Sequence, residues 1–311
     1  MLTEVATNIY QFTVHYPFDM RETNCYLFKG TKGFTVVDTG SRDAEAIKDW
    51  ERLFKSGITV EKVVFTHTHP DHVGLAHWFQ TRCHVPVLLS EQGAEKIQRS
   101  RGLDNGAWLN ELFRAHGGPQ MSAELLKLES PDNDFEPDGL FQDHQLITLG
   151  QSDYEAIWTP GHASDHFCFY NGETRILVAG DLVLAHLSPI VGIWEAGDET
   201  ALADYFKSLI KVKQKAVHLA LPGHGDLITD MNSRVDAIRA KHNYRLQQVL
   251  NAVRSDEKNA MQICEIIYGK LTEQYLFAPF MSIIARCAYL ESCRKLAHVV
   301  KRGVTYYGAT L

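Results

Sequence analysis

Three histidines and an aspartate fall within six residues of one another in the segment "VVFTHTHPDHVGLAHWF". The residues before them are β-branched or aromatic, as in a buried strand, and Pro70 marks the first turn of a helix after them. Alternate side chains of an extended segment point the same way, so His67 and His69 share a face. Asp71 and His72 lie beside them at the start of the helix. One strand end therefore gathers four side chains able to bind a metal.

The residue types in this motif are those of a metal site. Imidazole and carboxylate groups are the ligands expected of zinc, iron or manganese. No cysteine joins the motif, as it would in a structural zinc site. Histidines that are merely solvated in a loop are the alternative, and the position at a strand end argues against it. We therefore expect two adjacent metal subsites.

Three later segments each place one more ligand-capable residue directly after a predicted strand. They are "TPGHASDH" with His162, "LVAGDLVL" with Asp181 and "LPGHGD" with His224. A glycine before each histidine lets the backbone turn sharply, so that the imidazole can face inward. Loops at strand ends commonly combine into one site, so we expect these residues to meet the first motif.

Strands and helices alternate over residues 1–229. Segments rich in β-branched residues, such as "GFTVVDTG" and "VEKVVFTH", flank a predicted helix, "SRDAEAIKDWERLFKSG", whose apolar residues recur on one face. A long helical and loop region from about Glu91 to Pro137 follows, and strands then resume. Two successive runs of strands with interspersed helices predict a layered α/β sandwich.

The pattern changes near Asp230. Three segments with helical spacing follow, "NSRVDAIRAKHNYRLQQVLNAV", "KNAMQICEIIYGK" and "SIIARCAYLESCRKLAHVVKRG", and then a short strand-like "VTYYG". Three helices and a strand fit a small winged-helix-like domain. We therefore predict a catalytic domain over residues 1–229 and a mostly helical, winged-helix-like domain over residues 230–311.

Composition narrows the classes of function. Of the 311 residues, 22% are charged, the formal charge is −7 and no block of like charge stands out, so bulk electrostatics favour neither nucleic acid nor an anionic membrane as partner. No segment reaches the roughly 18 apolar residues of a membrane span, and the first residues lack a signal-peptide pattern. We predict a cytoplasmic protein without a membrane partner. Six scattered cysteines are expected to be buried or idle thiols.

Taken together, the motifs resemble those of the metallo-β-lactamase superfamily over roughly residues 1–229, and "NCYLF" and "VVDTG" resemble its early strands. The resemblance implies an αββα four-layer sandwich with a dinuclear metal site in a cleft along the sheet edges. The metal ligands that it implies are His67, His69 and His162 for one ion, Asp71, His72 and His224 for the other, and Asp181 for both.

The resemblance also implies two divalent cations, zinc foremost, with iron or manganese as alternatives. Two cations can share a hydroxide that attacks the substrate, and Asp71 or Asp181 could carry a proton to the leaving group. No Gly-x-Ser-x-Gly elbow occurs, so the nucleophile is expected to be water. Asp38 stands where a carboxylate would orient a ligand, with a cap for the next helix as the alternative.

Differences between this sequence and known branches of the superfamily limit the class of substrate that the resemblance implies. Asp181 replaces the cysteine of the exported antibiotic-hydrolysing enzymes, and His69 replaces the glutamate of the flavodiiron oxidoreductases. The hydroxyacyl-thioester hydrolases and lactonases remain, so we expect a metal-dependent hydrolase that cleaves an ester, thioester or lactone of a small molecule. A mononuclear-iron thiol dioxygenase is one alternative.

A ribonuclease or phosphodiesterase is the other alternative, in which the C-terminal domain would bind nucleic acid. Its cations alternate with acids, as on a solvated helix face, which disfavours this interpretation. A third interpretation makes the C-terminal helices an interface, for instance in a homodimer. The cations considered are Arg234, Arg239, Lys241, Arg245, Arg294, Lys295, Lys301 and Arg302.

Four further side chains are candidates for the substrate pocket. His166 and His186 lie close in sequence to predicted ligands, and Trp194 lies in the loop after Asp181. Trp108 belongs to the helical insertion, where ordinary packing explains it equally well. The remaining histidines are expected at the surface or satisfied in the core, namely His77, His84, His116, His144, His218, His242 and His298.

Overall fold

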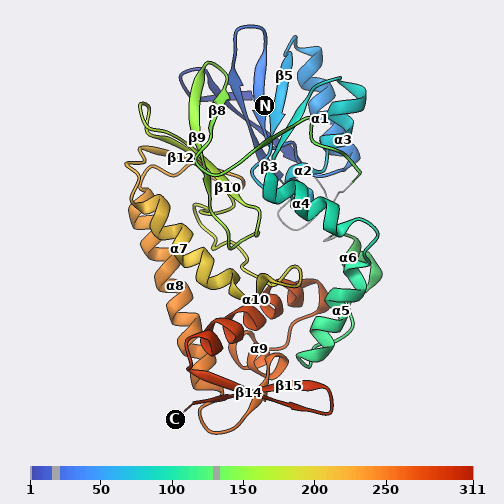
Figure 1. Cartoon of the computed structure of the whole chain (residues 1–311), viewed down its shortest axis with the longest axis vertical. Helices are drawn as coiled ribbons and strands as arrows, with labels where there is room; N and C mark the ends of the chain where they lie inside the picture. Colours follow the sequence, from blue (N-terminus) through green and yellow to red (C-terminus); the bar gives the residue numbers. More distant parts are fainter. Residues whose placement is uncertain (1, 16–21, 129–133, 311) are drawn as a thin grey trace.

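The computed structural model describes residues 2–15, 22–128 and 134–310. Two large sheets occupy one end of the molecule, and the C-terminal helices with a small sheet occupy the other (Figure 1). The first sheet has seven strands in the order β1-β2-β3-β4-β5-β6-β7. Its strands are β1 (Leu2–Ala6), β2 (Ile9–His15), β3 (Glu22–Lys29), β4 (Phe34–Val37), β5 (Val60–Val64), β6 (Val87–Ser90) and β7 (Gly139–Phe141).

The second sheet has five strands in the order β12-β11-β10-β9-β8. Its strands are β8 (Leu146–Leu149), β9 (Ser152–Trp158), β10 (Phe167–Asn171), β11 (Ile176–Gly180) and β12 (Leu219–Pro222). The pairs β4–β5 and β11–β12 are parallel, so the loops after these four strands leave the sheets at their carboxyl ends. Three of the predicted metal-binding motifs follow β5, β11 and β12, and the fourth, with His162, follows β9.

Helices flank both sheets and extend towards the C-terminal part (Figure 1). Those before residue 230 are α1 (Ala44–Lys55), α2 (Pro70–Val73), α3 (Ala76–Arg82), α4 (Glu91–Ser100), α5 (Asn105–Ala115), α6 (Ala123–Leu128), the 3₁₀ helix η1 (Asp198–Thr200) and α7 (Ala201–Lys213). One apolar cluster lies between the sheets and includes Tyr26 and Phe167, while a second packs α1 and α3 against the first sheet. This arrangement is the mixed α/β sandwich that the sequence predicts.

Helix α1 shows how the sequence fixes one of these layers. Asp43 caps its first turn by accepting a hydrogen bond from the backbone of Glu45. Trp50 is fully buried beneath the helix, and burial of such a side chain contributes about 1.5–3 kcal/mol. Its indole nitrogen donates to the carbonyl of Thr39 at 2.8 Å, which anchors the loop after β4.

The C-terminal part consists of α8 (Met231–Ala252), β13 (Lys258–Asn259), α9 (Ala260–Tyr268), α10 (Glu273–Ser292), β14 (Leu296–Lys301) and β15 (Val304–Ala309). The three strands form a small antiparallel sheet in the order β13-β15-β14. One apolar cluster runs from α5, α7 and β11 into α8, α9 and α10, so these helices share a core with the second sheet. The domain boundary after residue 229 stays a prediction.

One predicted element is wrong. The segment through "KLAHVVKRG" was expected to continue the third C-terminal helix, but that helix ends at Ser292 and a strand, β14, follows. Its adjacent β-branched residues Val299 and Val300 favour a strand. Arg302 and Gly303 have φ angles of 51° and 77°, which suits a two-residue hairpin turn into β15. Within the described residues, every helix is too short or too polar to cross a membrane.

Candidate metal centre

The structure brings together all seven residues that the sequence nominates as metal ligands. They come from the loops after β5, β9, β11 and β12 and from the first turn of α2. Within each of three overlapping groups the ligand-capable atoms lie within 4.8 Å of one another. The groups are His67 with His69 and His162, His67 with His72 and Asp181, and Asp71 with His72 and His224.

Four of the five histidines are held by the protein through Nδ1. The partners are the Thr66 hydroxyl for His67 at 2.9 Å, Asp38 Oδ2 for His72 at 2.9 Å, the Ile190 carbonyl for His162 at 2.8 Å and the Glu22 carbonyl for His224 at 2.7 Å. A ring held in this way keeps its Nε2 lone pair for the cluster. Such hydrogen bonds are the usual support of metal-binding histidines.

Several polar atoms at the centre of the cluster have no hydrogen-bond partner. They are Nε2 of His67, His69, His72 and His162, and Oδ1 of Asp181, and all five atoms are buried. Buried polar atoms without partners are rare because each loses its hydration without compensation. Nitrogen and carboxylate donors converging in this way fit divalent cations such as zinc, iron or manganese.

The Asp181 carboxylate lies between the two halves of the cluster. Its Oδ1 is 3.6 Å from Nε2 of His72, and its Oδ2 is 3.5 Å from Nε2 of His162 and 3.3 Å from Nε2 of His224. Asp71 approaches the second half only, with its Oδ2 3.2 Å from His224 Nε2. One carboxylate thus faces both groups of imidazoles, as the bridging position requires.

The pKa values of the imidazoles divide the cluster in two. Burial, reinforced by neighbouring imidazoles, lowers the pKa of His67 and of His69 well below the ordinary value. Burial lowers the pKa of His224 as well, but Asp181 and Asp71 raise it by more, to about 10. Burial is outweighed in the same way at His72, whose pKa is raised by nearby carboxylates. A raised pKa favours the protonated imidazole, so a cation that binds these two rings would have to displace a proton.

Asp38 is placed by strand β4 and the loop behind it. Its carboxylate accepts hydrogen bonds from His72 Nδ1 at 2.9 Å, from the Thr66 backbone at 2.9 Å and from the Thr66 hydroxyl at 2.8 Å. Its φ angle of 60° is left-handed, a strained conformation that tends to occur at functional sites. The cap of α1 is Asp43, so Asp38 orients a ligand-capable ring instead.

Sequence reasoning missed a buried ion pair beside the cluster. Lys96 of α4 donates to Asp165 Oδ1 at 3.0 Å, and both residues are buried. Asp165 Oδ2 accepts from the backbone of Thr68 at 2.8 Å, so the pair holds the loop that carries His67 and His69. In the sequence, the only indication of this ion pair is that Asp165 lies three residues after His162. Nothing local marks a lysine of the helical insertion as its partner.

Gly161 and Gly223, which precede His162 and His224, are required for different physical reasons. Gly161 has a φ angle of 141° and lies against the backbone of Tyr205, so it meets the expected need for an unusual turn. Gly223 does not have a positive φ angle. A Cβ atom there would lie 2.3 Å from Asp181 Oδ1 and 2.8 Å from His72 Cε1, so this glycine makes room for the cluster.

Two of the four pocket candidates have partners within the protein. His166 is fully buried, accepts a hydrogen bond from the backbone of Asp181 at 3.0 Å and pairs with the Thr159 hydroxyl at 2.8 Å. These contacts suit a residue that orients Asp181. His186 is exposed and its Nε2 lies 2.8 Å from Asp226 Oδ2. A surface ion pair of this kind contributes little.

The two tryptophans differ in their distance from the cluster. The ring of Trp194 lies 5.2 Å from that of His69, and its indole nitrogen donates to the His162 carbonyl at 2.8 Å. The ring of Phe277, from α10, lies 6.1 Å from that of Trp194. Trp108 is half-buried and packs against the C-terminal apolar cluster. Trp194 is therefore the aromatic candidate that adjoins the proposed ligands.

Comparison with known proteins identifies the family. The model of the metallo-beta-lactamase superfamily matches residues 19–224, which is more than half of the chain. The chain belongs to the metallo-beta-lactamase superfamily. The metallo-beta-lactamase fold implies divalent metals, and the described His/Asp cluster provides donors for them.

Relatives in this superfamily span most of the chain. A protein of Bacillus subtilis (strain 168) described as probable metallo-hydrolase YqjP is 25% identical over 310 residues, which cover 94% of each chain. The atrochrysone carboxyl ACP thioesterase of Aspergillus fumigatus is 25% identical over 286 residues, covering 85% of this chain and 75% of the thioesterase. These metallo-beta-lactamase superfamily relatives support an enzyme.

Two solved structures are similar over nearly the whole length. A metallo-beta-lactamase family protein of Thermus thermophilus has a TM-score of 0.86 and 25% identity, covering 99% of this chain and all of that one, 100%. A beta-lactamase domain protein of Burkholderia ambifaria has a TM-score of 0.84 and 24% identity, covering 99% and 95%, and shows the fold alone. The fold shared with these two proteins thus extends over the C-terminal helices.

Proposed function

We propose that the protein is a metal-dependent hydrolase of an ester, thioester or lactone, with a thioester as the first substrate to test. The observation that carries the proposal is the position of Asp181, whose carboxylate faces His162 on one side and His72 and His224 on the other. That arrangement suits two cations with one bridging carboxylate. Zinc is the first metal to test, and iron or manganese would use the same donors.

The side chains take distinct roles in this proposal. Two divalent cations bound here would supply Lewis acidity and lower the pKa of a water molecule towards neutrality. His67, His69 and His162 would hold one cation, and Asp71, His72 and His224 the other. Asp71 is the more exposed carboxylate, at 30% against 7% for Asp181, so we assign it the transfer of a proton to the leaving group.

A thioester is favoured by the relatives and by the aromatic side chain beside the cluster. The relative from Aspergillus fumigatus carries the name of a thioesterase, and its similarity extends over 85% of this chain. Trp194 stands next to His69 and could pack against an apolar acyl group. Hydrolysis would break the bond from the acyl carbon to sulfur, adding water to give an acid and a thiol.

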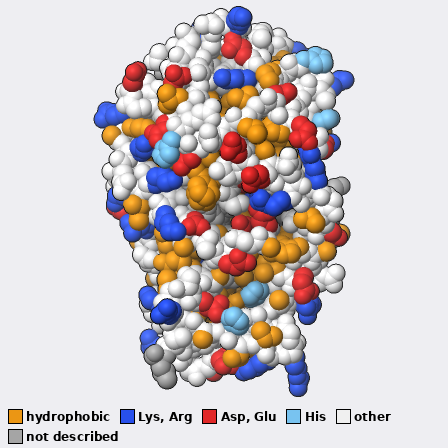
Figure 2. All heavy atoms as spheres, viewed as in Figure 1, with side chains coloured by type: hydrophobic (Ala, Val, Ile, Leu, Met, Phe, Trp, Pro, Cys, Tyr) orange, Lys and Arg blue, Asp and Glu red, His pale blue; other side chains and the backbone are white. Residues whose placement is uncertain are grey.

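The nuclease alternative has less support among the C-terminal cations. Arg234 donates to the carbonyls of Leu184 and Leu187, each at 2.6 Å, so its guanidinium is engaged within the protein. On the face seen in Figure 2, charged side chains of both signs are interspersed and form no continuous basic track. We further propose a cytoplasmic location, a winged-helix-like character for residues 230–311 and a homodimer as the assembly to test.

The test uses metal-loaded protein and a panel of an acyl thioester, a lactone, a simple ester and single-stranded RNA. We expect turnover of the thioester or its ester relatives and none of RNA. The control is His77→Ala, because His77 is an exposed histidine of the neighbouring helix α3. Activity on RNA alone would contradict the proposal, and oxygen consumption with a thiol and a single iron would favour the dioxygenase.

A further inference from the structure

A second buried histidine site lies between α8 and α10, away from the proposed metal centre. His242 of α8 is 3% exposed and Arg286 of α10 is 8% exposed. Both ring nitrogens of His242, and Nε and Nη1 of Arg286, are buried without a hydrogen-bond partner. A guanidinium keeps its charge at any working pH, so at least two charged donors are left unpaired. His242 was expected to be satisfied in the core or exposed, and it is neither.

Two cations of α8 lie near enough to act on this pair electrostatically. Lys241 adjoins His242 in the chain, and Arg245 lies three residues further on the same side of α8. Burial, with the charges of Arg286 and Lys241, lowers the pKa of His242 to about 3. Burial also lowers the pKa of Arg286 and of Lys241. The Tyr268 side chain acts in the opposite direction on the pKa of Arg286, and no carboxylate is among the main influences on either cation. In the described part of the chain, none of these four side chains has an acidic ion-pair partner.

Aromatic rings form the walls around the cations. Phe206 of α7 lies 5.7 Å from the ring of His242 and 5.4 Å from that of Tyr289. The guanidinium of Arg245 lies 4.7 Å from the ring centre of Tyr268, a cation–π contact. Phe206 and Tyr289 are half-buried, so the site lies just below the surface where α7, α8 and α10 meet (Figure 1).

The chain therefore supplies the cations of an ionic site and leaves out the anion. A buried charge without a counter-charge is strongly unfavourable, and a guanidinium fork matches the paired oxygens of a phosphate. We propose that Arg286, His242, Lys241 and Arg245 form a binding site for a phosphate-type oxyanion, either free phosphate or the phosphate group of a larger molecule. Several cations around one position suit a group of charge between −1 and −2.

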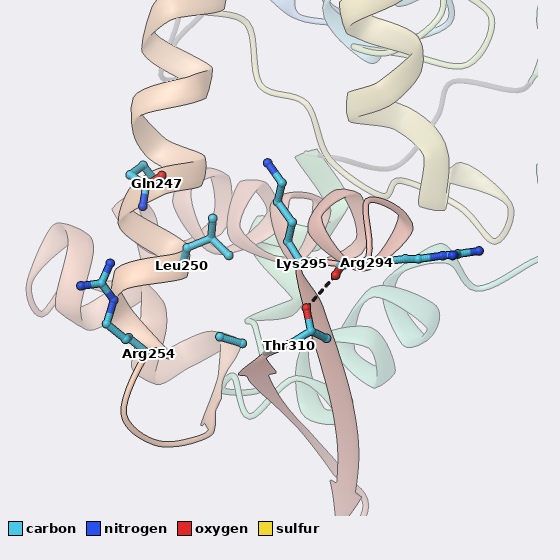
Figure 3. Close-up of a pocket in the computed structure, with 7 residues that line it drawn as sticks. Gln247, Leu250, Arg254, Arg294, Lys295 and Thr310 are labelled. Atoms are coloured by element: carbon cyan, nitrogen blue, oxygen red, sulfur yellow. Dashed lines mark hydrogen bonds between the residues drawn. The ribbon is translucent and has the colours of Figure 1, made fainter.

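A group of exposed cations elsewhere in the C-terminal part differs from the buried pair. A cavity of about 400 Å³ lies near the C-terminal end of α8 and is lined by residues that include Arg254, Arg294 and Lys295 (Figure 3). These three side chains are exposed, so water already solvates their charges. No counter-ion is required there. Arg254 lies close to the end of the helix that carries His242 and therefore provides a matched control.

The test is calorimetric titration of inorganic phosphate into the metal-loaded protein at constant ionic strength. Arg286→Met should weaken phosphate binding tenfold or more, while Arg254→Met should leave it unchanged. Any phosphate bound at the metal centre is common to all the proteins and cancels in this comparison. Equal binding by all three proteins, or no binding by any, would overturn the proposal.

Two further measurements test the proposal even if Arg286→Met fails to fold. The double variant Lys241→Gln/Arg245→Gln alters exposed and half-buried positions and should also weaken binding. A crystal structure grown with phosphate should show the anion between Arg286 and His242. Ordered water alone at that position would overturn the proposal.

Kinetics separate the two sources of the phosphate, and only this step rests on the proposed thioesterase activity. If the anion belongs to the substrate, Arg286→Met raises KM for a coenzyme A thioester and leaves KM for a phosphate-free thioester unchanged. If the anion is free phosphate, both KM values stay unchanged while phosphate binding is lost. Either outcome supports the site, because the binding measurement does not depend on turnover.

Discussion

The molecule buries histidine in two places with opposite surroundings. At the metal centre, Asp38, Asp71 and Asp181 lie among the imidazoles, and four rings are held through Nδ1. Between α8 and α10, the charged groups that act most on His242 are the cations Arg286 and Lys241, and neither ring nitrogen has a hydrogen-bond partner among the described residues. The proposed metal centre has the donors that divalent cations need. The site of His242 and Arg286 has the positive charge that an anion would balance. The charge of the surrounding side chains therefore indicates what each site would bind.

The largest effect is expected from His69→Ala at the metal centre. Loss of one proposed ligand should lower kcat/KM by about a thousandfold or more, which corresponds to about 4 kcal/mol of transition-state stabilisation. The bound metal should fall while the circular dichroism spectrum is unchanged. His77→Ala should behave as wild type. Retained activity in His69→Ala would remove the dinuclear assignment.

Stability measurements sharpen the comparison between paired and unpaired buried cations. Lys96→Met leaves Asp165 buried without its counter-charge and should cost about 3–5 kcal/mol of unfolding free energy in urea titration. Arg286→Met in phosphate-free buffer removes a charge that has no acidic partner, so it should cost about 1 kcal/mol at most or stabilise the protein. Equal destabilisation by both changes would erase the contrast between the two regions.

Asp38→Asn tests the support behind the cluster. The amide keeps the size of the side chain but weakens the hydrogen bond to His72 Nδ1, so metal affinity should fall by about 10-fold to 100-fold. Competition with a chromogenic chelator measures the change. Asp43→Asn is the control in the same loop, because asparagine also caps a helix. An unchanged affinity in Asp38→Asn would show that Asp38 serves the fold alone.

The smallest expected effect is the pH dependence of metal binding. Without metal, the raised pKa of His224, about 10, keeps that ring protonated at neutral pH, and a cation must displace the proton. Affinity should therefore rise about tenfold for each pH unit and displaced proton between pH 6 and pH 9. The His224 proton stabilises the metal-free protein fully below pH 6.5 and ceases to do so as pH rises through about 10. A flat affinity profile would contradict this assignment.

The proposed metal centre could be predicted from sequence because its information is local. His67, His69, Asp71 and His72 occupy one strand end and one helical turn, and glycine marks the loops that bring in the later residues. The sheets followed from the same strand periodicity. The proposed ligands and the strands could therefore be predicted without knowledge of contacts between distant segments.

The rest depends on contacts between distant segments. Lys96 and Asp165 are 69 positions apart, and neither lies in a motif that names the other. His242 and Arg286 lie on different helices, and no motif in the sequence links the two. The strand β14 was missed because its register is set by pairing with β15. The predicted helix was therefore continued past Ser292, where α10 ends.

Anomalous diffraction at the metal absorption edge tests the central claim most directly. Crystals of metal-loaded protein should show two peaks within the cluster, one among His67, His69 and His162 and the other among Asp71, His72 and His224, with Asp181 touching both. No peak in the cluster, or peaks only at other positions, would contradict the account.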